Sequence, residues 1–281
     1  MRSLRKTARR HGDSPKSASE NFAVVIRVRP PLKRELEAFK NVIRVQGEKE
    51  IQISENFDAV DSSNSHIFAQ HTFTFDRVYA SNATQKHVFD NTARGVVQSS
   101  LSGYNATILA YGQTGTGKTY TMEGFSNSAH ARAEERGIIP RSIEQIFGHI
   151  GKSVSPQLRF LVRCSYLQIY NEVISDLLKP ERTNLSIRED KKKGVFVEGL
   201  SEWVVRSPQE IYGLMQKGGA MRATGSHKYN ELSSRSHAVF IIICEQSETT
   251  YLHPDGRPLS AEEVFCIFFV CGKLLLHTDF K

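Results

Sequence analysis

Glycine, lysine and threonine recur at a fixed spacing in the segment GQTGTGKT, which covers residues 112–119. Gly112, Gly117, Lys118 and Thr119 match the pattern G-x-x-x-x-G-K-[ST], in which the backbone N–H groups of a loop converge on phosphate oxygens. The lysine of such a loop reaches the β- and γ-phosphates, and the hydroxyl after it ligates Mg²⁺. The segment therefore predicts a site for a nucleoside triphosphate and its magnesium ion.

The flanking residues favour this interpretation over a glycine-rich turn that matches by chance. The apolar residues ATILA precede the loop as a buried strand, and KTYTME follows it as the start of a helix whose positive end attracts anions. The motif alone does not say which nucleoside triphosphatase this is. We expect the nucleotide to be bound by Gly112, Gln113, Thr114, Gly115, Thr116, Gly117, Lys118, Thr119 and Tyr120, with Thr119 also on the metal.

A second polar loop, NELSSRSH, covers residues 230–237 just before an apolar strand. It offers Asn230, Ser233, Ser234 and Arg235 within a few residues. Serine hydroxyls can ligate Mg²⁺ or orient a water molecule, and arginine can stabilise phosphate or pair with an acid. From the residues alone, a loop that senses the γ-phosphate and a polar loop that caps the strand are both open.

Apolar patterning predicts the elements that must position these loops. Strands are expected over 21–31, 71–79, 106–111, 158–170 and 237–246, with further short strands near residues 41–55. We expect a helix from the cap Thr84 to the stop Gly103, one opened by Pro140, and one opened by the pair Ser207 and Glu210. NEVISDLL, after the strand 158–170, is interpreted as a helical turn, and the segment 184–205 as a hairpin whose tip carries Lys191–Lys193. The alternation predicts an α/β fold with a mainly parallel central sheet, helices on both faces, and ligands at the carboxyl ends of the strands.

Composition sets the limits of this interpretation. The chain has 281 residues and a net charge of +7, and six basic residues against one acidic residue lie within positions 1–19. We expect residues 1–20 to form a basic disordered tail, with a mitochondrial transit peptide as the less favoured alternative.

Four cysteines without C-x-x-C spacing indicate buried thiols in a reducing compartment. The apolar run over 264–276 is shorter than the roughly 20 residues of a membrane span and predicts a buried strand.

The motifs together resemble a kinesin motor domain. VVIRVRP, FTFDRVY, GYNATILAYGQTGTGKTYTMEG, GIIPR, SYLQIYNEVISDLL, GVFVEGL and NELSSRSHAVF occur in family order over about residues 22–246. The resemblance implies a P-loop NTPase, a microtubule-dependent ATPase with ATP and Mg²⁺ as ligands. It also implies microtubules as the partner and a location in the cytoplasm on the cytoskeleton. We expect no nucleic-acid partner and no membrane span.

The resemblance also assigns residue roles. Arg27 and Pro30 would flank the adenine, with Tyr120 stacking on it from the other side. Ser234 would lie on Mg²⁺, and Ser233 near the γ-phosphate and the attacking water. Arg235 would form a latch to an acid on a second switch, and Asn230 would belong to the nucleotide site. The lysines of the hairpin tip would lie near the tubulin-facing side, although a charge run is more often a solvated turn.

The similarity to kinesin stops after Gly272, Lys273 and Leu274. The family continues this strand with Asp-Leu-Ala-Gly-Ser-Glu, whereas this sequence reads LLHTDFK. We therefore expect residues 21–281 to form a partial motor domain, C-terminally incomplete, that lacks the second switch. Three alternatives stand: a working motor ATPase, a truncated or splice-variant head that binds nucleotide without motor output, and a different P-loop NTPase such as a small-molecule kinase, which the loop at 230–237 disfavours.

Overall fold

The computed structural model describes residues 22–38, 40, 42–54, 69–125, 133–153, 155, 158–191, 194–228, 236–252 and 258–271. The expected tail over residues 1–20 lies outside these ranges. The chain divides into two compact units, Met1–Ser81 and Asn82–Lys281, and each is described by itself.

The first unit is built from short strands. Three of them form an antiparallel sheet in the order β2-β3-β4, and β1 pairs in parallel with β5. Among its described residues, Ile51, Val78 and Tyr79 are the buried apolar ones. The elements are β1 (Val25–Arg27), the 3₁₀ helix η1 (Lys33–Ala38), β2 (Ile43–Gln46), β3 (Glu50–Ser54), β4 (Gln70–Thr74) and β5 (Arg77–Tyr79).

The second unit contains the main sheet, in the strand order β11-β7-β12-β13-β6, with β8 added beside β7. A separate hairpin pairs β9 with β10, as expected from the sequence. The strands of the second unit are β6 (Ala106–Ala110), β7 (Leu158–Tyr170), β8 (Val173–Asp176), β9 (Ile187–Asp190), β10 (Gly194–Val197), β11 (Trp203–Val205), β12 (His237–Leu252) and β13 (Pro258–Cys271). Its helices are α1 (Gln85–Val88), the π-helical η2 (Phe89–Ala93), α2 (Arg94–Ser100), α3 (Lys118–Met122), the 3₁₀ helix η3 (Ala133–Glu135), α4 (Ile138–Lys152) and α5 (Pro208–Lys228).

The direction of the strands corrects one expectation. The sequence pattern predicts a mainly parallel sheet, but within the described main sheet only β13 and β6 run parallel. The pairs β11–β7, β7–β8, β7–β12 and β12–β13 are antiparallel. For β12–β13 and β7–β8 the reason is the length of the connection, because strands joined by a short link can pair only as a hairpin. Only residues 253–257 separate β12 from β13, and two residues separate β7 from β8.

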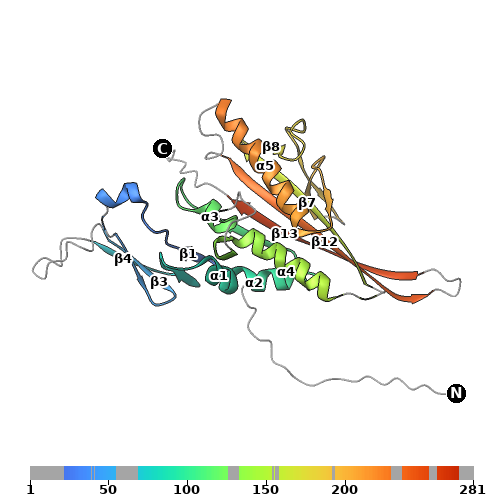
Figure 1. The fold of residues 1–281 in the computed structure, drawn as a ribbon, viewed down its shortest axis with the longest axis horizontal. Coiled ribbons are helices and arrows are strands. Elements are labelled where there is room, and N and C mark those ends of the chain that lie inside the picture. Colours follow the sequence, from blue (N-terminus) through green and yellow to red (C-terminus); the bar gives the residue numbers. More distant parts are fainter. Residues whose placement is uncertain are drawn as a thin grey trace, which may run out of the picture. The chain divides into compact units, whose positions relative to one another are not determined.

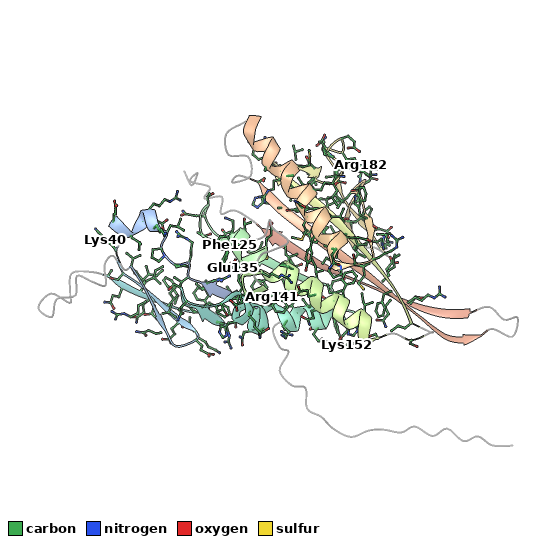
Figure 2. All side chains as sticks on the ribbon, viewed as in Figure 1. Lys40, Phe125, Glu135, Arg141, Lys152 and Arg182 are labelled. Atoms are coloured by element: carbon green, nitrogen blue, oxygen red, sulfur yellow. The ribbon has the colours of Figure 1, made fainter. Side chains whose placement is uncertain are left out.

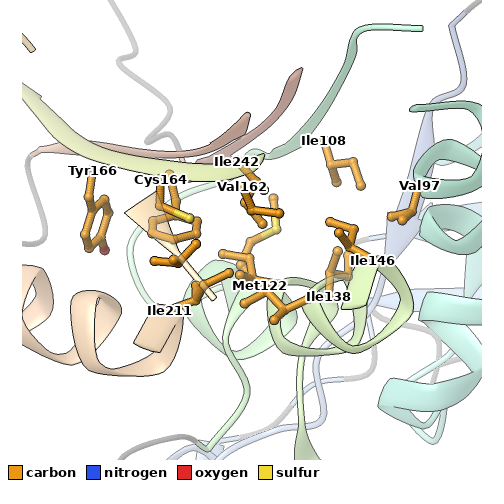
Figure 3. Close-up of a cluster of buried hydrophobic side chains, with 14 of the residues drawn as sticks. Val97, Ile108, Met122, Ile138, Ile146, Val162, Cys164, Tyr166, Ile211 and Ile242 are labelled. Carbon is orange, nitrogen blue, oxygen red and sulfur yellow. The ribbon is translucent and has the colours of Figure 1, made fainter. Parts of the chain in front are cut away.

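The helices pack on one face of this sheet. Alternate residues of β7, Val162, Cys164 and Tyr166, belong to the same buried cluster as Ile242 of β12 and Ile108 of β6. Figure 3 shows these side chains facing those of the helices, which contribute Val97, Met122, Ile138, Ile146 and Ile211. In Figure 1, α4 and α5 run alongside the long strands. Burial of these apolar faces is the main source of stability.

The opposite face corrects a second expectation, that helices cover both sides of the sheet. The odd-numbered Leu167 and Ile241 point away from the helices because successive strand residues alternate between faces. They join a smaller cluster with Ile174 of β8, and residues Leu185, Val197 and Leu200 pack against it. In the described part of the chain, strands and loops therefore cover this face.

The capping residues predicted at two helix starts are confirmed. The Thr84 hydroxyl accepts a hydrogen bond from the N–H of His87 at 3.1 Å. The Ser207 hydroxyl accepts one from the N–H of Glu210, and the Glu210 carboxylate accepts one from the N–H of Arg206, so the two ends of this capping arrangement are both satisfied. α4 begins two residues before Pro140.

The helical turn predicted over NEVISDLL is wrong. Asn171 and Glu172 adopt positive φ angles of 49° and 64° and reverse the chain in two residues. β8 then pairs back onto β7, with Val173 opposite Tyr170. Two consecutive left-handed residues are the geometry of a tight hairpin turn, which ends any helical path at this point.

The described thiols match the expectation of buried cysteines. Cys164 and Cys244 are free and buried, and burial raises the pKa of Cys164 to about 12. In the described part of the chain, no helix is both long and apolar enough to cross a membrane.

The contact between α5 and β7 generates a stability prediction. A Cβ on Gly218 would lie 2.2 Å from Cδ1 of Tyr166, whose ring is buried edge-to-face against Phe240. Gly218→Ala should therefore lower the free energy of unfolding by about 1–3 kcal/mol, the usual cost of overpacking. The control is Gly213→Ala on the same helix, where a Cβ meets nothing within 4 Å and alanine should stabilise by up to about 1 kcal/mol. Urea denaturation of both variants measures the two effects, and equal shifts would contradict the packing argument.

Candidate functional site

Strand β6 delivers the glycine-rich loop. Ile108 faces the helices and is buried, whereas Thr107 and Leu109 face the other side and are exposed. The strand runs parallel to β13, with Ala110 opposite Cys271, so the chain leaves it toward Tyr111 at the carboxyl end. The expected strand before the loop is therefore confirmed.

The loop at 112–117 depends on glycine at three places. Gly112, Gly115 and Gly117 have φ angles of 153°, 86° and 95°, in a region where residues with a Cβ are strained. At Gly112 a Cβ would also lie 2.7 Å from the Thr116 hydroxyl. That hydroxyl donates to the carbonyl oxygen of Gln113 at 2.8 Å, which closes the loop on itself. The backbone geometry therefore favours glycine at these three positions.

Lys118 lies directly over this loop. Its Nζ donates to the carbonyl oxygens of Gly112 at 3.0 Å and of Gln113 at 2.8 Å. The ammonium group is therefore held beside the backbone on which the motif predicts phosphate. Thr119, the next residue, is exposed, so its hydroxyl is within reach of solvent or a ligand.

The helix that follows the loop is short and is anchored by a neighbour. α3 has five residues, so the predicted helix is confirmed but its dipole acts over little more than one turn. The buried side chain of Gln85 donates to the carbonyl oxygen of Tyr120 at 2.6 Å and to that of Glu135 at 3.4 Å. Gln85 thereby ties α1 to α3 and to η3.

Tyr120 presents a partly exposed ring in the second unit. It packs edge-to-face against Phe125, with ring centroids 5.0 Å apart, and Phe125 itself is 68% exposed. Figure 2 labels Phe125 at the end of this segment. The two rings form an aromatic surface two residues beyond Lys118, which suits the predicted stacking role.

The other predicted adenine neighbours belong to the first unit. Arg27 ends β1 and is partly buried, and Pro30 is exposed. Between them, Arg29 donates two hydrogen bonds to the carboxylate of Glu35, and the N–H of Leu32 donates a third. These bonds lower the pKa of Glu35 to about 2. The roles of Arg27 and Pro30 at the base stay predictions.

Most of the second predicted loop lies outside the described residues. Asn230, Ser233, Ser234 and Arg235 are among the residues outside the described ranges, and their roles stay predictions. The segment after Cys271 is also outside these ranges. The described structure resumes at Ser236, which is buried, and His237 begins β12. Arg222 of α5 donates to Ser236 through Nε, at 3.1 Å from the hydroxyl, and through Nη2, at 2.8 Å from the carbonyl oxygen.

Three residues with contacts near the predicted loops were not predicted from the sequence: Gln85 and Phe125, which contact Tyr120, and Arg222, which contacts Ser236. The hydrogen bonds of Gln85 and Arg222 join residues 35 and 14 positions apart, whereas Phe125 contacts Tyr120 five positions away. The available signal was a polar side chain within an apolar pattern, as at Gln85 and Arg222. That signal identifies a buried polar group but does not name its partner.

A strand, a glycine-rich loop with an overlying lysine, and a helix are the parts of a P-loop nucleotide-binding protein. Comparison with known proteins specifies the family. The sequence profile of the kinesin motor domain matches residues 27–257. The chain is 42% identical to a kinesin heavy chain of Gibberella moniliformis over 231 residues, which are 82% of this chain and 23% of the relative. It is 47% identical to the kinesin-like protein KIF3C of Bos taurus over 178 residues, 63% of this chain and 22% of the relative.

The fold agrees with the sequence comparison. A solved structure described as that of a fast kinesin superposes with a TM-score of 0.75 at 37% identity, covering 92% of this chain and 68% of the other. The chain belongs to the kinesin motor-domain family. It spans about a quarter of the length of the curated relatives that it matches. The family resemblance and the P-loop NTPase fold expected from the sequence are confirmed.

Proposed function

We propose that this chain binds ATP with Mg²⁺ through residues 112–119 and serves as the nucleotide-handling part of a microtubule motor. The observation that supports the proposal is the loop itself. Three glycines at positive φ leave the backbone open to a close anion, and the Lys118 ammonium is already held over it. The family membership of the chain supports ATP as the nucleotide and microtubules as the partner, and hence a location on the cytoskeleton.

Lys118 would bind phosphate by exchanging partners. Its bonds to the carbonyl oxygens of Gly112 and Gln113 hold the ammonium in place before a ligand arrives. Phosphate oxygens carry full negative charge and are stronger acceptors than carbonyls, so the ammonium would turn to them without moving far. The loop keeps its shape through the Thr116 bond to Gln113, which involves no charged group.

Mg²⁺ suits the donors that the loop offers. The described residues contain no cluster of three or more histidine, cysteine or acidic side chains that could hold a metal ion. Mg²⁺ bound with a nucleotide takes its ligands from phosphate oxygens, water and a hydroxyl, and the exposed Thr119 supplies that hydroxyl. Ser234 is proposed as a second hydroxyl ligand from the family resemblance. The ion would neutralise phosphate charge beside Lys118.

Hydrolysis of the bound ATP is a separate part of the proposal. Ser233, Ser234 and Arg235 are proposed to act at the γ-phosphate, with Asn230 in the same loop. Residues 275–280 read LLHTDF where the family motif is Asp-Leu-Ala-Gly-Ser-Glu, so neither its glycine nor its glutamate stands at that place. Phosphoryl transfer depends on positioning and charge stabilisation. We therefore propose that this chain binds nucleotide more effectively than it hydrolyses it.

The phosphate site is tested by Lys118→Ala. Loss of the ammonium should weaken ATP binding at least tenfold, because a charge-assisted bond contributes about 1.5–3 kcal/mol. A titration with a fluorescent ATP analogue measures the change. Lys152→Ala, at the end of α4, is the matched control and should bind as the unmodified chain does. Equal affinity in the Lys118 variant would rule out the proposed site.

The adenine contact is tested by Tyr120→Ala. Removal of the ring should weaken ATP by about 1–3 kcal/mol, the usual range for a base stacked on an aromatic side chain. Inorganic tripolyphosphate, which has no base, should bind almost unchanged. If both ligands weaken equally, the ring supports the fold through Phe125 and does not contact the base.

The motor output is tested by phosphate release with and without polymerised tubulin. We expect slow release that microtubules do not accelerate, because residues 275–280 read LLHTDF at the place where the family has the glycine and glutamate of its second switch. The same preparation must first bind nucleotide, which separates an inactive protein from an unfolded one. Strong stimulation by microtubules would show that the chain works as a complete motor ATPase.

A further inference from the structure

A groove lies between α2 and α4 within the second unit. Its volume is about 450 Å³, and residues of η2, α2 and α4 line it. The side-chain amide of Gln145 in α4 donates to the carbonyl oxygen of Arg94 in α2 at 3.2 Å, which joins the two helices, and Figure 1 shows them as neighbours. Sites that bind small ligands usually have volumes of about 300–1,000 Å³, so this α2–α4 groove is large enough to hold a ligand.

A glycine keeps the middle of the groove open. Gly148 lines the groove and is exposed, and a Cβ at this position would meet nothing within 4 Å. Glycine weakens the interior of a helix relative to alanine. At this position it leaves a space over α4 that any other residue would partly fill.

The charge of the lining is predominantly positive. Among the described residues that line the groove, Arg94, Arg141 and Lys152 carry positive charge, and Glu144 carries negative charge. The carboxylate of Glu144 forms an ion pair with Arg136, which is not one of the lining residues. A cleft lined by an excess of one sign of charge attracts ligands of the opposite sign. The groove therefore favours an acidic ligand.

Both arginines of the groove are held in position by the protein. Arg141 donates through Nε to the carbonyl oxygen of Arg136 at 2.9 Å and through Nη2 to that of Glu134 at 3.2 Å. Arg94 donates through Nε to the carboxylate of Asp90 at 3.1 Å, and its side chain stays 53% exposed. Side chains that are already held lose less freedom when a ligand binds, so these two cations are prepared for binding.

The spacing of the cations excludes a single small anion as the ligand of the whole groove. Arg141 and Lys152 lie on the same helix, and the rise of an α-helix places them about 16 Å apart along its axis. Figure 2 labels them at separate places along α4. An extended peptide advances about 3.3 Å per residue, so about five residues span this distance. Side chains at alternate positions of such a peptide point to the same side, which matches cations along one groove.

We propose that the α2–α4 groove binds an extended acidic segment of a partner protein, with carboxylates at alternate positions directed to Arg141, Arg94 and Lys152. Charge complementarity and the length of the groove identify this occupant. The proposal does not depend on nucleotide binding, because none of the residues that line the groove belongs to the loop at 112–119.

The experiment measures the fluorescence anisotropy of a labelled peptide titrated with the full chain. The probe is a peptide with blocked ends in which glutamate alternates with serine, Glu-Ser-Glu-Ser-Glu. One matched peptide has glutamine in place of every glutamate, and another has the same composition with its glutamates together. We expect the alternating peptide to bind and the glutamine peptide not to bind. The clustered peptide should bind about threefold more weakly, the effect of losing one exposed ion pair, because its carboxylates cannot reach both ends of the groove.

Two leucine variants test the place of binding. Gly148→Leu fills the middle of the groove and should abolish binding of the alternating peptide. Gly151→Leu is the matched control, because a Cβ there also meets nothing within 4 Å and Gly151 is not one of the lining residues. Both variants replace glycine in the same helix with a stronger helix former, so neither should lower the thermal stability.

A charge variant tests one end of the groove. Lys152→Gln should weaken the alternating peptide about threefold, the effect of one exposed ion pair. Arg182→Gln is the control, because it removes a cation that Figure 2 shows far from Arg141 and Lys152. It should leave the affinity unchanged. Thermal unfolding of every variant identifies any loss of folded protein before the titrations are compared.

Several outcomes would overturn the proposal. Equal affinity in Gly148→Leu and the unmodified chain would place the peptide elsewhere. No binding of the alternating peptide, or equal binding of the glutamine peptide, would show that the groove does not recognise carboxylates. Competition by inorganic phosphate as effective as that of unlabelled peptide would indicate a small-anion site, and tighter binding of a short oligothymidylate would indicate nucleic acid. None of these results bears on the proposed function, which Lys118→Ala tests separately.

Discussion

The site depends on a close contact between two stretches of backbone, residues 122–124 and 135–137. Gly124 and Arg136 form a bridge, and a Cβ on Gly124 would lie 2.1 Å from the carbonyl oxygen of Glu135. Any side chain larger than the hydrogen of Gly124 would force these two segments apart. The contact joins the end of the five-residue α3 to the start of α4, whose Ile143 and Ile146 are fully buried against the sheet. A helix too short to be stable alone is thereby fixed by tertiary contacts.

The arrangement separates a rigid support from an exposed loop. One face of the sheet and the helices α2 to α5 form the main buried cluster, and the loop begins where β6 leaves that cluster. Gln113, Thr114, Gly115 and Thr116 are all exposed, so they contribute little to the core and remain open to a ligand. Binding residues on loops held by a rigid scaffold are common because the scaffold supplies stability and the loop supplies chemistry.

The structure could be predicted from the sequence where it depends on residues that are close together in the chain. The caps at Thr84 and Ser207, the strand before the loop and the glycine-dependent loop geometry all depend on residues within about five positions of one another. The strand directions could not be predicted, because they depend on which distant strands pair and on how short their links are. The same limit applies to the site: Lys118 was found from its motif, whereas the bond from Gln85 to Tyr120 joins residues that no local pattern relates.

The source of phosphate affinity follows from the geometry of α3. A helix of five residues has a small dipole, and its effect is screened further because the loop is open to solvent. At the proposed phosphate site, affinity would therefore come chiefly from Lys118 and the N–H groups of the loop. The loop is not the whole of the predicted site, because Arg222 fixes Ser236 just before β12, near the end of the second predicted loop.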